Sequence, residues 1–205
     1  MSDGKRILLI ISGGIAAYKS LELIRELKLH DINVRCILTE AGSQFVTPLS
    51  AEALTGDKVY RDLFSLTDEN EMGHIELSRD ADLVVIAPAT ANIIAKMRAG
   101  ITDDLATTAL IATDKPVLIA PSMNVRMWEH ASTHSNMVEL KKRGIHVIGP
   151  EIGDMACGEH GMGRMSEPSS IAQIINELLQ NNSDTSANQS IITNNLKKLV
   201  GRKAI

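Results

Sequence analysis

VLIAPSMN, at residues 117–124, is the stretch that decides the fold of this 205-residue chain. Its first four residues form a short apolar run, which is typical of a parallel strand buried on both faces. The run stops at Pro121, and a hydroxyl, a thioether and a carboxamide follow it. In open α/β sheets, ligands bind just beyond the carboxyl ends of the strands. The stretch therefore predicts both a central strand and the edge of a binding site.

Asn124, which ends this stretch, has two possible roles. A carboxamide offers two donors and an acceptor, so it can clamp a planar polar group such as a carboxylate. Asn is also a good N-cap, so its alternative role is to cap the helix that follows it. The residues alone favour neither role over the other.

Other apolar runs predict further strands, which alternate with helical patterns. The predicted strands cover residues 6–12, 34–38, 83–87, 117–120 and 146–148. The predicted helices cover residues 15–30, 45–54, 93–99, 105–112, 136–143 and 171–179, and residues 57–72 are predicted to be irregular. This alternation is typical of βαβ units, so we expect an α/β fold with a parallel sheet.

Gly13-Gly14 lies between the first predicted strand and the first predicted helix. Free N–H groups and the helix dipole make such a turn a ready anion site. The next strand ends at Thr39, whose hydroxyl suits a phosphate better than the ribose diol of a dinucleotide. We interpret the turn as a mononucleotide site, although it matches neither GxGxxG nor the P-loop pattern. The alternative is an ordinary tight βα turn.

The strand over residues 83–87 ends in the same way as the strand over residues 117–120. It runs into Pro88-Ala89-Thr90-Ala91-Asn92. Two neighbouring strands would then deliver a small residue, a hydroxyl and an amide to one edge of the sheet. Small residues let a flat ring lie close to the backbone, and the polar groups can bind its rim.

His74 and Cys157 are candidates for proton transfer. A lone His is more often a capping or surface residue, but its pKa of about 6.5 suits proton transfer near neutral pH. Cys157 lies in the glycine-rich stretch 153–165, which is predicted to be a loop mobile enough to act as a flap. A free Cys is commonly a small buried hydrophobe, whereas an exposed thiol in such a loop can donate a proton.

Two acidic residues, Asp103 and Asp104, precede the helix predicted over residues 105–112. Acids at a helix N-terminus are expected from the helix dipole, so capping is the favoured interpretation for this pair. The chain has no CxxC pair, and we expect no metal site.

Composition and charge exclude several classes of protein. The net charge of −4 argues against a nucleic-acid or anionic-membrane partner. Two cysteines make no disulfide framework and fit a reduced cytoplasmic setting, and no apolar segment approaches the length of a membrane span. We expect one domain over residues 1–180, followed over residues 181–205 by a polar linker and the start of something longer.

Five short motifs occur in order at the predicted strand ends and loops. They are Gly13-Gly14-Ile15-Ala16-Ala17-Tyr18-Lys19, Gly73-His74-Ile75, Ala87-Pro88-Ala89-Thr90-Ala91-Asn92, Pro121-Ser122-Met123-Asn124 with Met127-Trp128, and Ala156-Cys157-Gly158-Glu159. Together they make residues 5–180 resemble the homo-oligomeric, flavin-containing cysteine decarboxylases, and among these the phosphopantothenoylcysteine decarboxylases of coenzyme A synthesis. Residues 197–205 resemble the start of the phosphopantothenate–cysteine ligase domain of bifunctional chains.

The resemblance implies a Rossmann-like (flavodoxin-like), doubly wound parallel sheet in a three-layer α/β/α fold that binds FMN. It implies assembly as trimers or dodecamers of trimers, with active sites at subunit contacts. His74 would be the catalytic base in a neighbour's site, Asn124 would hold the substrate carboxylate, and Cys157 would be the proton donor. The implied FMN-binding residues are Gly13, Gly14, Ile15, Ala16, Thr39, Phe45, Pro88, Ala89, Thr90, Asn92 and Met123. The implied substrate-binding residues are Asn124, Met127, Ala156 and Cys157.

The reaction implied by the resemblance is the FMN-dependent decarboxylation of 4′-phosphopantothenoylcysteine to 4′-phosphopantetheine. Oxidation of the thiol to a thioaldehyde supplies an electron sink, CO₂ then leaves to give an enethiol, and the enethiol is reduced again. One alternative is a peptidyl-cysteine oxidative decarboxylase, which does not need the reduction step assigned to Cys157. Another is a non-catalytic regulatory flavoprotein of the same fold, which His74 and the lack of a long acidic tail disfavour.

Overall fold

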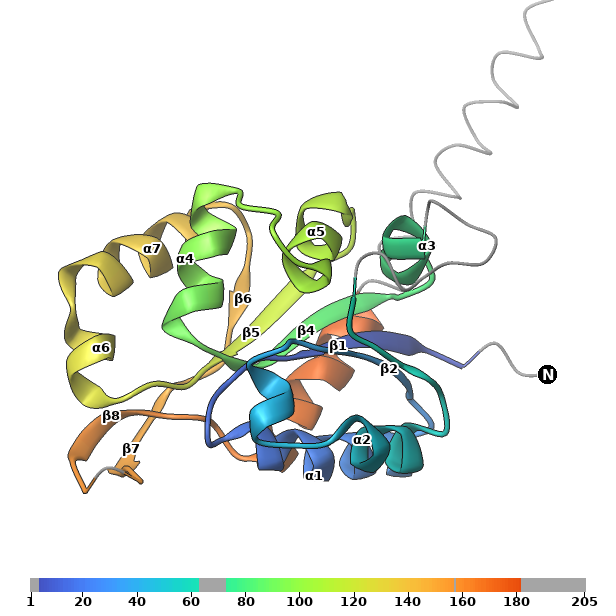
Figure 1. Ribbon diagram of the computed structural model, residues 1–205, viewed down its shortest axis with the longest axis horizontal. Helices are drawn as coiled ribbons and strands as arrows, with labels where there is room; N and C mark the ends of the chain where they lie inside the picture. The colour runs from blue at the N-terminus through green and yellow to red at the C-terminus, as the bar shows by residue number, and fades with distance from the viewer. Residues whose placement is uncertain (1–3, 63–72, 157, 182–205) are drawn as a thin grey trace, which may run out of the picture.

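The computed structural model describes residues 4–62, 73–156 and 158–181, and for residues 73–75 it describes the backbone alone. Six strands pair in parallel in the order β3-β2-β1-β4-β5-β6 (Figure 1). The strands are β1 (Arg6–Ile11), β2 (Asn33–Leu38), β3 (Val59–Tyr60), β4 (Leu83–Ala89), β5 (Val117–Pro121) and β6 (His146–Val147). This is the Rossmann strand order, and without the short edge strand β3 it is the flavodoxin order.

Helices cover both faces of the sheet (Figure 1). One face carries α1 (Ala17–Leu29), α2 (Pro48–Thr55) and a helix over residues 168–181, and the other carries α3 (Gly73–Arg79), α4 (Ala91–Ala99), α5 (Leu105–Ala112) and α7 (Ala131–Lys142). Along β1, Ile7, Leu9 and Ile11 face the first layer, and Leu8 and Ile10 face the second. All five side chains are fully buried, so the prediction of a doubly wound, three-layer fold is confirmed.

Short polar side chains set the starts of the helices around the sheet edge. Thr90 caps α4 by accepting from the N–H of Ile93, and Asp104 caps α5 in a reciprocal capping box with Thr107. The capping role expected for Asp104 is therefore confirmed. Asp103 instead forms an ion pair with Lys96, at 2.7 Å.

β3 and α7 differ clearly from the prediction. β3 falls inside the stretch predicted to be irregular, because two strand residues are too few to give a periodic signal. α7 begins at Ala131, five residues before its predicted start at Asn136. The ring Nδ1 of His130 accepts from the N–H of Ser132 at 3.1 Å, so an imidazole caps this helix in place of the usual Ser, Thr, Asp or Asn.

The prediction of a loop over residues 153–165 is wrong. β7 (Glu151–Asp154) and β8 (His160–Arg164) form an antiparallel hairpin that lies below α6 (Val125–Glu129) in Figure 1. Its glycines serve close packing: a Cβ on Gly163 would overlap the carbonyl oxygen of Met123, and a Cβ on Gly161 would lie 2.9 Å from Val125. The glycine content therefore reflects docking of the hairpin, not an open loop.

No helix in the described ranges is both long and apolar enough to cross a bilayer. The linker and the start of a further domain that we predict over residues 181–205 fall, beyond residue 181, outside the described residues.

Cys36 lies on β2 and is fully buried, and this burial raises the pKa of its thiol to about 12. Because the thiolate is the reactive species, we expect Cys36 to resist iodoacetamide at pH 8 in the folded protein and to react once denaturant is added. Mass spectrometry of digested protein measures the modification at this residue. Labelling of Cys36 at the same rate with and without denaturant would contradict the expectation.

Candidate functional site

A cavity of about 1020 Å³ opens at the carboxyl ends of β1, β2, β4 and β5. The strand order reverses between β1 and β4, and this switch point is where open α/β sheets bind ligands. The volume is at the upper end for small-molecule sites, so the cavity has room for a cofactor and a substrate together. The predicted site residues that line it are Gly13, Gly14, Ile15, Ala16, Thr39, Thr90, Asn92, Met123, Asn124, Met127 and Ala156.

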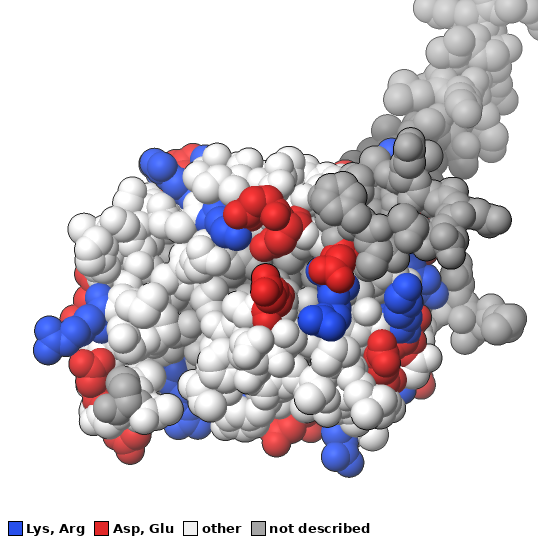
Figure 2. Space-filling view, in the orientation of Figure 1, with Lys and Arg blue, Asp and Glu red and all other residues white. Residues whose placement is uncertain are grey.

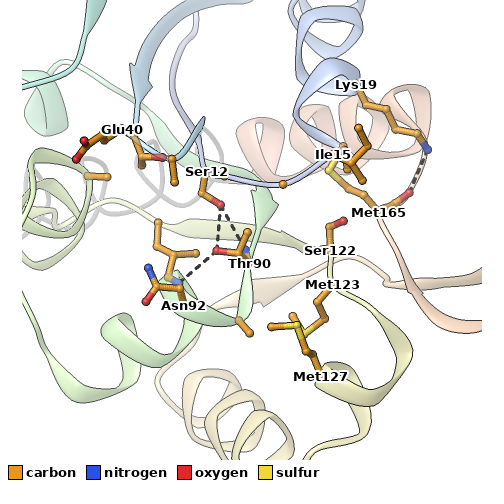
Figure 3. Close-up of a pocket in the computed structure, with 18 of the residues that line it drawn as sticks. Ser12, Ile15, Lys19, Glu40, Thr90, Asn92, Ser122, Met123, Met127 and Met165 are labelled. Atoms are coloured by element: carbon orange, nitrogen blue, oxygen red, sulfur yellow. Dashed lines mark hydrogen bonds between the residues drawn. The ribbon is translucent and has the colours of Figure 1, made fainter. Parts of the chain in front are cut away.

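Ser12 and Thr90 hold the two sides of the switch point together (Figure 3). Ser12 is only 3% exposed, and its hydroxyl donates to the carbonyl of Pro88 at 2.6 Å and accepts from the N–H of Thr90 at 3.4 Å. These bonds fix the end of β1 against the end of β4. Sequence reasoning missed Ser12, although a hydroxyl directly before Gly13 at the end of an apolar strand was a usable signal.

The turn between β1 and α1 presents its backbone to the cavity. The N–H groups of Gly14, Ile15 and Ala16 have no hydrogen-bond partner within the part of the chain that the structure describes. They precede the first turn of α1, where the helix dipole favours negative charge. The turn can therefore bind an anion or an acceptor atom of a ligand.

The two glycines of this turn serve different purposes. A Cβ on Gly13 would come within 2.8 Å of the backbone of Ala41, so only glycine fits there without a shift of the backbone. A Cβ on Gly14 would meet no atom nearer than the methyl of Thr90, at 3.6 Å. Gly13 is thus a packing requirement, whereas the absence of a side chain at Gly14 leaves that part of the cavity wall flat.

Four other predicted cofactor residues have different surroundings. The hydroxyl of Thr39 donates to the carbonyl of Ile11 at 3.3 Å and accepts from the N–H of Gly42 at 3.0 Å, so its single proton is already used. Phe45 is 47% exposed and does not line the cavity. Pro88 and Ala89 form the end of β4, directly before the lining residue Thr90. Their cofactor-binding roles stay predictions.

Asn124 caps a helix and lines the cavity at the same time. Its Oδ1 accepts from the N–H of Met127 at 2.8 Å, which fixes the carboxamide at the start of α6. No hydrogen bond from its Nδ2 to the described residues is present, so two donors are available to a ligand. The two roles left open by the sequence are therefore compatible. Met123 and Met127 lie side by side on the same wall (Figure 3).

The β7–β8 hairpin closes another side of the cavity. Its lining residues include Met155 and Ala156 from the turn and Gly163 from β8. The N–H of Met123 donates to the carbonyl of Gly163 at 3.0 Å, so the hairpin is joined to the loop that carries Asn124. Cys157, which follows Ala156, lies outside the described residues. So does the side chain of His74, whose backbone is in the first turn of α3.

Comparison with known proteins places the chain in a family. Residues 1–180 match the family described as Flavoprotein. The chain is a member of the flavoprotein family. The bifunctional coenzyme A biosynthesis protein CoaBC of Vibrio vulnificus (strain YJ016) is 45% identical over 177 residues, which are 86% of this flavoprotein and 44% of that relative. This flavoprotein thus spans less than half the length of the curated relative that it matches.

Two solved structures resemble this flavoprotein over almost their whole length. One is a Cys-to-Ser mutant of PPC decarboxylase complexed with pantothenoylaminoethenethiol, with a TM-score of 0.77, 34% identity, and coverage of 86% of this chain and 99% of that one. The other is the FMN binding protein AtHal3, with a TM-score of 0.75, 34% identity, and coverage of 87% and 98%.

Several charged side chains around the cavity of this flavoprotein form ion pairs. Lys96 donates to Asp103 at 2.7 Å, which raises the pKa of Lys96 and lowers the pKa of Asp103. Acidic side chains gather in the middle of the face drawn in Figure 2, with basic side chains beside them. Sequence reasoning missed Lys96 and the cavity-lining Lys19, because a lysine in a helix resembles an ordinary surface residue.

No site for a metal ion is present among the described residues. His130 and His134 have an HxxxH spacing, but His130 is used as a helix cap. No three His, Cys, Asp or Glu side chains gather in the described ranges in a way that could hold a metal ion.

Proposed function

We propose that this flavoprotein is an FMN-dependent phosphopantothenoylcysteine decarboxylase. It converts 4′-phosphopantothenoylcysteine to 4′-phosphopantetheine and CO₂ in coenzyme A biosynthesis. The observation that carries the proposal is one cavity that joins an open glycine turn to a carboxamide with two available donors. The similarity to CoaBC and to a PPC decarboxylase supports the substrate. A cytoplasmic location is part of the same proposal and fits the free thiol of Cys36.

The residues present fit FMN. The flat wall at Gly14 and the small side chain of Ala16 allow a planar ring to lie close to the backbone. The unpartnered N–H groups of the turn and the amide of Asn92 supply donors for the polar groups of the cofactor. Similarity to the FMN binding protein AtHal3 supports this cofactor. FMN, when bound, supplies a hydride acceptor that makes loss of CO₂ from a cysteine possible.

Asn124 would bind the carboxylate that leaves as CO₂. Its two Nδ2 protons can donate to the two oxygens of one carboxylate, while Oδ1 remains bonded to the N–H of Met127. This arrangement fixes the carboxylate relative to the backbone of the loop. Met123 and Met127 line the cavity beside this position and present apolar thioethers to the substrate.

His74 and Cys157 would move protons. In the proposal, the imidazole of His74 accepts the thiol proton of a substrate bound in a neighbouring subunit, a kind of step that contributes about 10²–10⁴-fold. The thiol of Cys157 donates a proton to the enethiol.

Because His74 would act in a neighbouring subunit, the proposal includes a homo-oligomer. The exposure of Ile15 (60%) and Tyr18 (52%) at the cavity supports a second copy there. Light scattering after size-exclusion chromatography measures the assembly.

One experiment tests the proposed function directly. The purified protein is expected to show the absorption spectrum of a flavin and to release CO₂ from 4′-phosphopantothenoylcysteine. The same assay with a peptide that ends in an unmodified cysteine distinguishes the peptidyl-cysteine alternative. A colourless protein that takes up no FMN, or a flavin-loaded protein that leaves the phosphorylated substrate unchanged, would refute the proposal.

The Cys157→Ser enzyme is expected to separate the two halves of the reaction. Without the proton from Cys157, CO₂ release continues until about one equivalent per flavin has formed, and the flavin then stays reduced. Stopped-flow absorbance of the flavin and mass spectrometry of the product measure the two halves. Multiple turnovers to 4′-phosphopantetheine at the wild-type rate would remove Cys157 from this role. The Cys36→Ser enzyme is the matched control, because Cys36 is buried away from the cavity.

A further inference from the structure

Lys19 is a buried cation to which the proposed reaction gives no role. It lies in the first turn of α1 and lines the cavity, yet the residue is only 7% exposed. Lysine is almost never buried without a partner, because the desolvation of its charge is costly. The contacts of its ammonium group therefore show what holds it in this position.

The ammonium of Lys19 connects α1 to the segment that follows the hairpin. Its Nζ donates to the carbonyl of Met165 at 3.3 Å (Figure 3) and to Oε1 of Glu167 at 2.9 Å. Glu167 also pairs with Arg164. The hydrogen bond from Lys19 holds the pKa of Glu167 below its usual value, so this carboxylate stays ionised at neutral pH.

The contacts continue from Met165 to the loop that carries Asn124. Met165 directly follows β8 and is 1% exposed. Two residues earlier, the carbonyl of Gly163 accepts from the N–H of Met123 at 3.0 Å, with the two backbones in direct contact. Met123 precedes Asn124. Lys19 therefore stands at one end of a continuous set of contacts between the glycine turn and the carboxamide.

We propose that Lys19 is a positioning residue that fixes the spacing between the glycine turn and Asn124 through β8. The role of Asn124 in substrate binding rests on the proposed function, whereas the mechanical link rests on the contacts alone. The ammonium of Lys19 is buried and held by a carbonyl and a carboxylate. It therefore fixes the position of the end of β8 relative to α1. Displacement of a binding group by about 1 Å can lower the rate about 10²-fold. Loss of the contacts of Lys19 is therefore expected to lower the rate of the reaction.

The test compares Lys19→Met with Lys28→Met in the flavin-loaded full chain. Methionine keeps an unbranched side chain and removes the ammonium. Lys28 is the matched control, because it lies in the last turn of the same helix and donates to the carbonyl of Leu54 at 2.6 Å, away from the cavity. Amide hydrogen exchange, measured by mass spectrometry, follows the peptides that contain residues 122–124 and 160–165.

In Lys19→Met, both peptides are expected to exchange faster than in wild type. The flavin content is expected to stay unchanged, and kcat/KM to fall by about 10²-fold. Lys19→Arg keeps a cation. In this variant we expect amide exchange and kcat/KM to return part of the way to their wild-type values. In Lys28→Met, exchange and kcat/KM stay at wild-type values.

Unchanged exchange in Lys19→Met, or an equal increase in Lys28→Met, would overturn the proposal. If Lys19→Met does not accumulate as folded protein, Glu167→Gln removes the charge of the partner carboxylate instead. The same two peptides must then exchange faster than in wild type, and no change overturns the proposal. Amide exchange is measured without turnover of substrate. If the wild-type protein proves inactive on the substrate, the proposed function is refuted, but the effect of Lys19 on exchange still tests the mechanical link.

Discussion

The Asn124→Asp enzyme is expected to fold normally, to bind FMN and to lose about 10³-fold in kcat/KM, because like charges placed together cost several kcal/mol. The substitution replaces one NH₂ group with an oxygen and leaves the shape of the side chain unchanged. Both donors toward the substrate carboxylate are lost, and a negative charge faces that carboxylate in their place. Steady-state CO₂ release with 4′-phosphopantothenoylcysteine measures the loss.

The same substitution leaves the local fold intact, which makes it a clean test. Oδ1 of Asn124 accepts from the N–H of Met127 at 2.8 Å, and an aspartate oxygen accepts this bond equally well. Asp and Asn are similar as N-caps, so α6 and the melting temperature should not change. Asn136→Asp is the matched control, since Asn136 lies on α7 outside the cavity lining. A kcat/KM for Asn124→Asp within tenfold of wild type would show that Asn124 does not hold the carboxylate.

The central sheet could be predicted from the sequence because its strands are buried on both faces. A run such as Leu83–Ala87 carries no polar residue, and its length distinguishes it from a helix. The hairpin of β7 and β8 could not be predicted in this way. Its glycines at positions 161 and 163 have no side chains, so they give no alternating pattern. Glycine is required there because the backbone packs closely against Val125 and Met123, which are far away in the sequence.

Residues of the site were predictable where they follow a strand end. Thr90 directly follows β4, and Asn124 lies in the loop just after β5, where parallel strands present ligand-binding groups. Lys19 was not predictable from its spacing, because its partners are 146 and 148 residues away and its helix also carries exposed charges. Burial of a charge is a tertiary property, so only the structure reveals that this lysine belongs to the wall of the cavity.

The Gly14→Val protein is expected to fold and to be purified without flavin. A Cβ at Gly14 meets no atom nearer than 3.6 Å, and the φ angle of Gly14 is not positive, so valine is compatible with the backbone. The added side chain instead occupies the flat wall where the ring would lie. We expect the flavin content to fall below about a tenth of wild type, since the misfit of one or two methyl groups costs about 1–3 kcal/mol. The absorbance ratio of flavin to protein measures it.

Two further variants separate loss of the cofactor site from loss of the fold. Gly14→Ala adds a methyl that only reaches van der Waals contact with Thr90, so it should retain more flavin than Gly14→Val. Gly13→Ala brings a methyl within 2.8 Å of the backbone of Ala41 and should lower the free energy of unfolding by about 1–3 kcal/mol. If Gly14→Val binds FMN as wild type does, the ring does not lie against this wall. If Gly14→Val instead melts as early as Gly13→Ala, the two glycines do not have the separate roles that their surroundings indicate.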